Sequence, residues 1–227
     1  MTPGFINKQI CLSVAALIAV ITLFYFSDLD LAISAKLYDP LTHSWPIRID
    51  EPIKRLLLYD GFKRVFICGC GCVLIACAIL YKSAFVQARK KRLIVFFLSV
   101  ALVPSLVGAL KNLTEVPCPC EIVNFGGIYP DIKVFDAYPA DFTPPNKAKC
   151  WPAGHASMGF SLMSLYFVCR GTRTRKISLA TAIAIGWITG VYKMLLGDHF
   201  FSHTLVTMIL AWLVILLIAK LNRYASS

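Results

Sequence analysis

The sequence predicts an all-α membrane protein, a bundle of six transmembrane helices that forms a single domain over residues 1–227. Two observations support this fold class. Hydrophobic residues make up 58% of the chain and charged residues only 15%, whereas soluble domains carry about 25% charged residues. The apolar residues also occur in long blocks, and not in the stripes of an amphipathic helix, which is typical of helices that cross a bilayer.

Six apolar blocks are candidates for crossing the membrane, and several are close to the lower limit of ~17 residues that a bilayer requires. They are residues 9–26, 65–81, 93–110, 155–169, 177–196 and 204–219. The fourth block is short, so we expect its helix to begin inside the preceding loop. The first block has one lysine before it and no Ala-x-Ala cleavage site after it, which favours a retained helix over a removable signal peptide.

The distribution of charge predicts the orientation of the bundle. All 12 acidic residues lie in the connections 27–64, 111–154 and 197–203, while the termini and the connections 82–92 and 170–176 carry basic residues only. The positive-inside rule therefore places both termini in the cytoplasm and the acidic connections in the periplasm of a bacterial inner membrane. The net charge of +11 follows from this topology and from attraction to anionic membrane lipids, so it requires no nucleic acid partner.

The first acidic connection predicts two short helices lying at the membrane interface. The segments 29–39 and 51–62 are helix-like and are separated by prolines. Trp45 and Tyr59 would then lie at the level of the lipid headgroups, where aromatic residues are enriched. A plain connecting loop is the alternative.

The second acidic connection, 111–154, is too long for a simple link and contains Cys118, Cys120 and Cys150. In an oxidising periplasm, Cys150 could pair with either of the other two and tie the ends of this connection together. The run Cys-Gly-Cys-Gly-Cys at 68–72 does not favour a metal site, because this spacing spreads the thiols around a helix. Small residues in a span more often allow close helix packing.

Ionisable residues gather at the predicted outer ends of the spans. Three of the 4 histidines lie there, His155, His199 and His203, together with Lys111 and Lys193. His199 and His203 would share one helix face if a helix begins at this point. Ionisable groups at membrane depth are costly and are candidates for function, so we expect these five residues to meet in one pocket.

Phosphoryl transfer through a covalent histidine suits this set of residues. One neutral imidazole attacks phosphorus, and a second, protonated imidazole gives its proton to the leaving alcohol. Lysines and backbone N–H groups hold the phosphate oxygens. The turn Ala153-Gly154-His155 opens a helix, and a helix N-terminus offers such N–H groups to an anion.

Three motifs carry a resemblance to a known family. The chain has Lys111, six residues and Cys118-Pro119; then Pro152-Ala153-Gly154-His155; then Tyr192-Lys193, five residues, His199, three residues and His203. This order and spacing over residues 111–203 resembles the type-2 phosphatidic acid phosphatase superfamily, which includes vanadium haloperoxidases. The family motifs read Lys-x6-Arg-Pro, Pro-Ser-Gly-His and Ser-Arg-x5-His-x3-Asp.

The resemblance implies a role for each matching residue. His199 would be the nucleophile that becomes phosphohistidine, and His155 the general acid. Lys111 and Lys193 would bind the phosphate together with the Gly154 N–H. The resemblance implies no metal and no organic cofactor.

Four departures from the family pattern affect the expected roles. Cys118 and Lys193 replace arginines, which removes two planar forks for phosphate oxygens. Ala153 replaces a serine, and the hydroxyl of Ser157, one turn later, is a candidate substitute.

His203 replaces the aspartate that orients the nucleophile. A neutral His203 can accept a hydrogen bond from the His199 ring N–H, and Asp198 is the alternative partner. A bacterial subgroup of the family has a similar pattern, which favours a coherent variant site.

The sequence therefore predicts a lipid phosphatase of the inner membrane with a periplasmic site. Its substrate would be phosphatidate, phosphatidylglycerophosphate, a polyprenyl diphosphate or lipid A. A lipid-to-lipid phosphotransferase would use the same residues. A zinc site formed by His155, His199 and His203 is a further alternative, but the two lysines suit an anion. A non-catalytic lipid-phosphate-binding relative or a transporter also remains, although no internal repeat favours a transporter.

Overall fold

The structure is a computed structural model that describes residues 3–47 and 61–224. It is helical, and no β-strand occurs in the described ranges, which confirms the all-α fold class. The long helices are α1 (Pro3–Tyr25), α4 (Gly61–Ile79), α6 (Lys90–Thr114), α9 (Thr172–Leu195) and α10 (Phe201–Tyr224). Shorter elements are α2 (Leu29–Ala35), α5 (Ala84–Gln87), η2 (Pro119–Glu121), η3 (Val123–Phe125), α7 (Gly154–Ser161), η4 (Leu162–Ser164) and α8 (Leu165–Val168).

The five long helices are long and apolar enough to cross a membrane, and they correspond to five of the six predicted spans. Most extend beyond the predicted limits. For example, α6 begins at Lys90 and α9 at Thr172, inside connections that the sequence assigned to the cytoplasm. The physical reason is that a helix continues past the apolar core of the bilayer into the headgroup region, where basic side chains are tolerated.

The fourth predicted span, 155–169, is helical but broken into α7, η4 and α8, of 8, 3 and 4 residues. Serine hydroxyls accompany the break: Ser161 Oγ donates to the Met158 carbonyl and Ser164 Oγ to the Ser161 carbonyl, each at 2.7 Å. Such hydroxyl-to-backbone bonds compete with regular helix geometry. This segment is not among the five long apolar helices, so the count of six spans stays a prediction.

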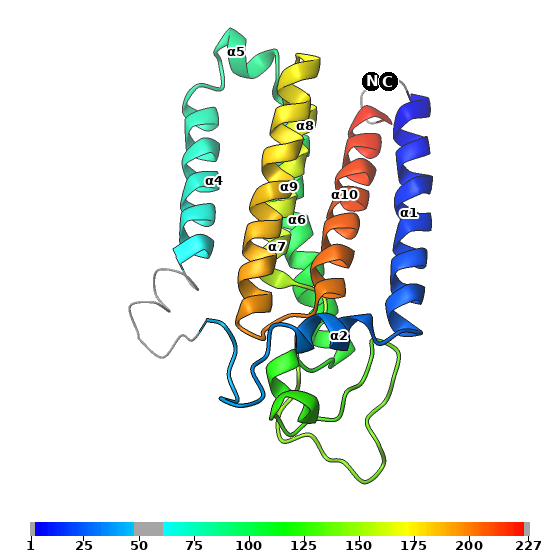
Figure 1. The fold of residues 1–227 in the computed structure, drawn as a ribbon. Helices are drawn as coiled ribbons and strands as arrows, with labels where there is room; N and C mark the ends of the chain where they lie inside the picture. Colours follow the sequence, from blue (N-terminus) through cyan, green and yellow to red (C-terminus); the bar gives the residue numbers. More distant parts are fainter. Residues whose placement is uncertain (1–2, 48–60, 225–227) are drawn as a thin grey trace.

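The two ends of the bundle differ in content. Figure 1 shows both chain termini at one end, together with α5 and the link between α8 and α9. The other end, here called the loop end, carries α2, the connection 115–153 and the link 196–200 between α9 and α10. This separation agrees with the predicted grouping of basic and acidic connections, while the membrane face that each end meets stays a prediction.

Helix α10 lies at the centre of the packing. It contacts α1 on one side and α6 and α7 on the other, and α7 also packs against α9. The crossing of α7 and α9 depends on two glycines. A side-chain carbon on Gly159 would lie 2.7 Å from Gly186 Cα, and one on Gly186 would lie 2.2 Å from the Phe160 ring. Small residues thus bring α7 close to α9, a common device in membrane bundles.

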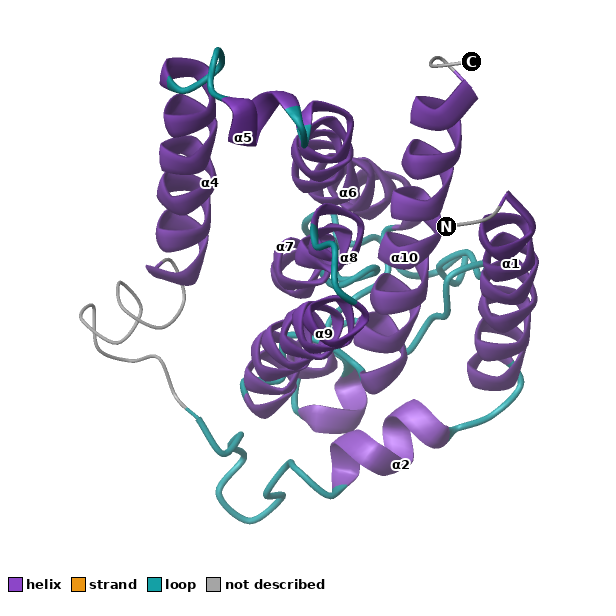
Figure 2. Cartoon of the chain, turned by 90° about the horizontal axis from the view of Figure 1, so that it is seen from above, coloured by secondary structure: helices purple, strands orange, loops and turns teal. Residues whose placement is uncertain are grey.

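Helix α4 differs from the others because it stands at the periphery, as Figure 2 shows. None of its residues is buried, and nothing lies within 4 Å of a side-chain carbon built onto Gly69 or Gly71. The close packing that the sequence predicted for the run 68–72 is therefore not observed among the described residues. Its cysteines are exposed or half-buried.

The connection 115–153 forms a cap with its own small core at the loop end. The buried residues of this core are Ile122, Phe125, Tyr129, Ala148 and Phe200. Half-buried Trp45 packs against it, with its ring centroid 5.4 Å from that of Phe125.

Of the two predicted interfacial helices, the first is present as α2. The second, 51–62, and its Tyr59 lie almost entirely outside the described residues; the last two positions of that segment begin α4.

Candidate active site

The five predicted ionisable residues converge at the loop end. They come from different elements: Lys111 ends α6, His155 begins α7, Lys193 ends α9, His199 lies in the link after α9, and His203 begins α10. Each of the other four lies close enough to His199 for its positive form to disfavour a proton on the His199 ring. The ring centroids of His199 and His203 are 5.9 Å apart.

The turn after α9 places His199. Gly197 adopts a left-handed φ of +74°, and a side-chain carbon there would lie 2.4 Å from the Trp45 ring, so this position requires glycine. The Asp198 N–H donates to the Lys193 carbonyl at 2.9 Å. The Lys193 Nζ, on a side chain only 2% exposed, forms an ion pair with Asp198 Oδ2 at 2.9 Å. The Asp198 carboxylate therefore faces Lys193, which argues against it as the partner of the His199 ring.

His199 and His203 were expected to share one helix face if a helix begins at His199, and this condition is not met. Helix α10 begins at Phe201, so His199 precedes the helix and only His203 belongs to its first turn. A capping contact explains the later start, because Asp30 of α2 accepts the Ser202 N–H at 2.9 Å and also the Ser202 hydroxyl. The two rings still meet, because the tight turn at Gly197 folds the link back onto α10.

The partner of the His199 ring differs from the predicted one. Cys150 is disulfide-bonded to Cys118, with the Cα atoms 5.1 Å apart, which decides between the two pairings that the sequence left open. The Cys150 Sγ lies 3.4 Å from His199 Nδ1. The His203 ring bonds to the Cys150 backbone, and its Nδ1 has no hydrogen-bond partner among the described residues. His203 thus contacts the site through Cys150, and not by accepting from His199 as predicted.

The environment of His199 keeps its imidazole neutral. The pKa of His199 lies well below its usual range, first because burial disfavours the charged ring, and then because Lys111 and the other positive groups repel a further proton. Only 4% of the residue is exposed. A neutral imidazole retains the lone pair that a nucleophile needs.

The N-terminus of α7 completes the anion-binding side of the site. Its N-cap, Ala153, provides no side-chain hydrogen bond, so the first N–H groups of the helix remain available to a ligand. A side-chain carbon built onto Gly154 would lie 3.5 Å from Lys111 Nζ. Lys111 and the Gly154 backbone therefore flank the same space.

Ser157 does not fit the role that the sequence suggested for it. The residue is fully buried, and its hydroxyl donates to the Gly154 carbonyl at 2.6 Å. A hydroxyl has one proton to donate, and that proton is directed at the backbone of the first turn of α7. We therefore leave Ser157 out of the phosphate-binding set.

Cys120 is a residue that motif matching did not reveal. Its N–H donates to the Gly197 carbonyl at 2.9 Å, which links η2 to the turn before His199. Its thiol is free, and burial, followed by the negative charges of Asp198 and Glu121, raises the pKa of this thiol to about 12. The thiol therefore stays protonated at neutral pH.

One group of side chains has the spacing of a metal site. The donor atoms of Cys150, His199 and His203 lie within 4.8 Å of one another. A metal would need Cys150 as a thiolate, but the disulfide removes that option and leaves two imidazoles. His155, which the three-histidine alternative requires, is not part of this group. The donor set of the oxidised protein therefore does not fit a structural or catalytic zinc.

The fold and the site together define an all-helical protein with five helices apolar enough to cross a membrane and a buried histidine-lysine site suited to an anion. A family model described as the PAP2 superfamily matches residues 92–227, and the chain belongs to this superfamily. The match confirms the resemblance drawn from the three motifs, contains every candidate residue, and indicates a phosphatase-type activity at the level of the family. Comparison with curated proteins and with solved structures gave no match.

Proposed function

We propose that the protein is an inner-membrane lipid phosphatase that hydrolyses a lipid phosphate or diphosphate monoester at the periplasmic face through a phosphohistidine. One observation carries the proposal: His199 is buried, with its pKa lowered by burial, and lies near Lys111, Lys193 and His155 at the loop end of the bundle. A phosphate group at this point meets a nucleophile, an acid and positive charge together.

The first half-reaction transfers the phosphoryl group to the enzyme. Because His199 Nδ1 faces Cys150, Nε2 is the nitrogen that attacks phosphorus. The bond from phosphorus to the lipid oxygen breaks, and protonated His155 gives its proton to that oxygen, which leaves as an alcohol. Lys111 and the Gly154 N–H hold the other phosphate oxygens, which carry the negative charge.

The second half-reaction releases inorganic phosphate. Neutral His155 now acts as a base and takes a proton from a water molecule, whose oxygen attacks the phosphorus of phosphohistidine. The bond between phosphorus and Nε2 breaks, and its electron pair returns to the His199 ring. The sum is one water consumed, with one alcohol and one phosphate released, and both histidines regain their starting protonation states.

A groove between α1, α9 and α10 supports a lipid as the substrate. It has a volume of about 340 Å³ and apolar walls that include Leu12, Ile183 and Trp212. Another wall residue, Met208, lies five residues after His203 on α10, or roughly 7.5 Å along a helix. An acyl chain attached to a phosphate at the site has the length to reach this groove. Phosphatidate, phosphatidylglycerophosphate, a polyprenyl diphosphate and lipid A are the candidates.

The test is phosphate release by the purified protein in detergent. The panel contains the four candidate lipids, with and without a chelator, and compares the wild type with His199→Ala and with His43→Ala as a histidine control outside the site. We expect release that resists the chelator and falls at least ~10³-fold in His199→Ala only. Full release by His199→Ala would refute the nucleophile. Release that the chelator abolishes would point to the metal alternative, and phosphate that appears on a second lipid would point to a transferase.

A further inference from the structure

The disulfide between Cys118 and Cys150 touches the proposed nucleophile directly. The Cys150 Sγ lies 3.4 Å from His199 Nδ1 and 2.7 Å from the carbonyl oxygen of Asp198. Cys150 is fully buried and His199 nearly so, so water does not compete for this contact. A disulfide sulfur carries no hydrogen and can only accept. A hydrogen bond in this contact therefore requires the hydrogen to be on Nδ1 of His199.

No carboxylate among the described residues accepts the Nδ1–H of His199. The Asp198 carboxylate is paired with Lys193, and the His203 ring bonds to the backbone of Cys150. A neutral imidazole has two tautomers, and only the form with its hydrogen on Nδ1 presents a lone pair at Nε2. The sulfur is thus the acceptor that the structure places where a tautomer-setting partner is needed.

We propose that Cys150 is a positioning residue for the phosphoryl transfer, whose sulfur accepts the Nδ1–H of His199 and holds Nε2 ready to attack phosphorus. This inference rests on the proposed function of the site. The bond to Cys118 keeps the sulfur in place, and both partners are anchored. The Cys150 N–H donates to the Val116 carbonyl at 2.9 Å, and the Cys118 N–H donates to Glu121 Oε2 at 2.7 Å.

The bridge and the acceptor can be separated by mutation because they depend on different atoms. Cys118→Ala breaks the bridge but keeps the Cys150 sulfur, whose new thiol hydrogen can point at the Asp198 carbonyl while the sulfur still accepts. Cys150→Ala breaks the bridge and also removes the acceptor, which leaves a buried Nδ1–H without a partner. Cys150→Ser breaks the bridge and leaves a hydroxyl that can accept. All three variants carry Cys120→Ala, so that no other cysteine of the cap replaces the lost partner.

The experiment measures kcat, KM and thermal unfolding of the three variants, with Cys120→Ala alone as the reference. We expect all three to unfold at similarly lowered temperatures, because each lacks the bridge. We expect the kcat of Cys150→Ala to be at least roughly tenfold below that of Cys118→Ala, with Cys150→Ser between them and KM little changed. Equal kcat values for Cys118→Ala and Cys150→Ala would overturn the proposal and reduce the disulfide to a cross-link.

A second measurement does not depend on activity. Nitrogen-15 NMR of histidine-labelled protein, assigned with His199→Ala, reports which ring nitrogen of His199 carries the hydrogen. The Nδ1–H form should dominate in the reference and in Cys118→Ala, and should give way to a mixture in Cys150→Ala. If Cys118→Ala does not fold, chemically reduced reference protein takes its place, because it keeps the same sulfur. An Nε2–H form in the reference would overturn the proposal even if the enzyme is active, whereas an inactive protein with the Nδ1–H form would refute only the proposed function.

Discussion

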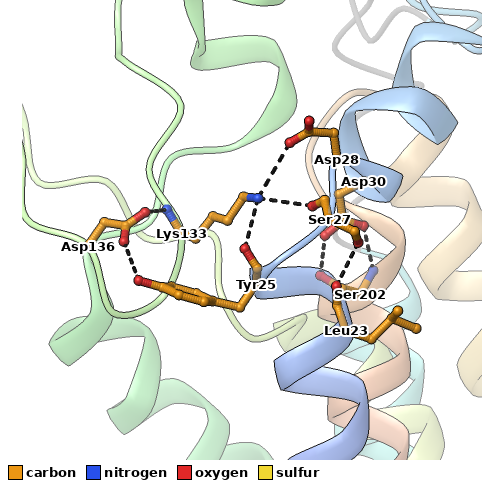
Figure 3. Close-up of polar contacts among 8 residues, drawn as sticks. All are labelled: Leu23, Tyr25, Ser27, Asp28, Asp30, Lys133, Asp136 and Ser202. Carbon is orange, nitrogen blue, oxygen red and sulfur yellow. Dashed lines mark hydrogen bonds and ion pairs between the residues drawn. The ribbon is translucent and has the colours of Figure 1, made fainter.

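Two clusters of charged groups lie at the loop end, and they differ in what their charges meet. In the cluster drawn in Figure 3, Asp30 and Lys133 meet helix ends. The other two carboxylates contact neighbouring groups: Asp28 pairs with Lys133, and Asp136 accepts from the Tyr25 hydroxyl. Asp30 accepts the Ser202 N–H and hydroxyl at the start of α10. The Lys133 Nζ donates to the carbonyls of Tyr25 and Ser27 at the end of α1, at 3.0 and 2.9 Å. These charges complement the partial charges of the helix termini.

The cluster around His199 is organised differently. Asp198 pairs with Lys193, but Lys111 has no carboxylate within 4 Å among the described residues, and the first N–H groups of α7 have no side-chain cap. The site therefore keeps unneutralised positive charge, which suits a phosphate. Under the proposed function, the junction of α1, α2 and α10 uses charge for stability, while the site keeps charge for a ligand. Mutations should separate the two uses.

Among the mutations that test this comparison, the largest effect is expected for Lys111→Met, which removes positive charge from the site. The catalytic efficiency kcat/KM should fall by roughly 10²-fold. The positive charge of Lys111 is, after burial, the next largest cause of the lowered pKa of His199. Its removal raises that pKa, so His199 becomes protonated, and loses its lone pair, at a higher pH. The acidic limb of the profile of kcat/KM against pH should therefore move to higher pH.

The matched control for this prediction is Lys147→Met. Lys147 forms a 2.7 Å ion pair with Glu115, and both side chains are more than 40% exposed. Exposed pairs of this kind contribute little, so both kcat/KM and the acidic limb should stay as in the wild type. An acidic limb that does not move in Lys111→Met would show that Lys111 does not act on His199 electrostatically.

The second prediction concerns the start of α10, where an effect on stability is expected. Asp30→Ala leaves the Ser202 N–H and hydroxyl without their acceptor and should lower the free energy of unfolding by about 1–3 kcal/mol. Asp30→Asn keeps an amide oxygen for the N–H and should cost less than half as much. Thermal unfolding in detergent measures both. Equal losses in the two variants would show that an amide oxygen does not replace the carboxylate as acceptor, and wild-type stability in both would show that the capping bonds contribute nothing.

The charge of Asp30 gives this prediction a pH dependence. Burial raises the pKa of Asp30, and this outweighs the hydrogen bonds from Ser202, which lower it. Because the pKa in the folded state lies above that in the unfolded state, the unfolded state loses its proton first as pH rises. Stability should therefore fall as the pH increases from ~3.9, the ordinary value, through the folded pKa. Asp30→Asn should abolish this part of the pH dependence.

The sequence predicts this molecule unevenly, for physical reasons. Apolar blocks specify five helices long enough to cross a membrane, because a bilayer imposes length and composition directly. The family motifs select His199, His155 and Lys111 because their spacing is a property of the chain. In contrast, the contact between Cys150 and His199 involves a disulfide whose second cysteine the sequence does not identify. The spacing of cysteines alone does not determine which of them are paired. The orientation of the Ser157 hydroxyl depends on the local geometry of α7.

The caps by Asp30 and Lys133 have no sequence signal either. Each joins a helix end to a residue more than 100 positions away, while recognised capping motifs use residues next to the helix end. Only the packing of α2 and of the connection 115–153 over the bundle brings these groups to the termini. The same argument explains why α10 begins at Phe201, a position that lies between the apolar block 204–219 and the conditional start at His199.

The smallest effect is expected for Lys133→Met. The change removes a cation and two hydrogen bonds from the carbonyl end of α1, but the side chain is 29% exposed, so water can replace part of what is lost. The free energy of unfolding should fall by only ~0.5–1 kcal/mol, and kcat/KM should stay unchanged because Lys133 belongs to the junction. Lys147→Met again serves as the exposed control. If Lys133→Met loses activity without losing stability, Lys133 contributes to phosphate binding. The two clusters would then not differ in the use of their charges.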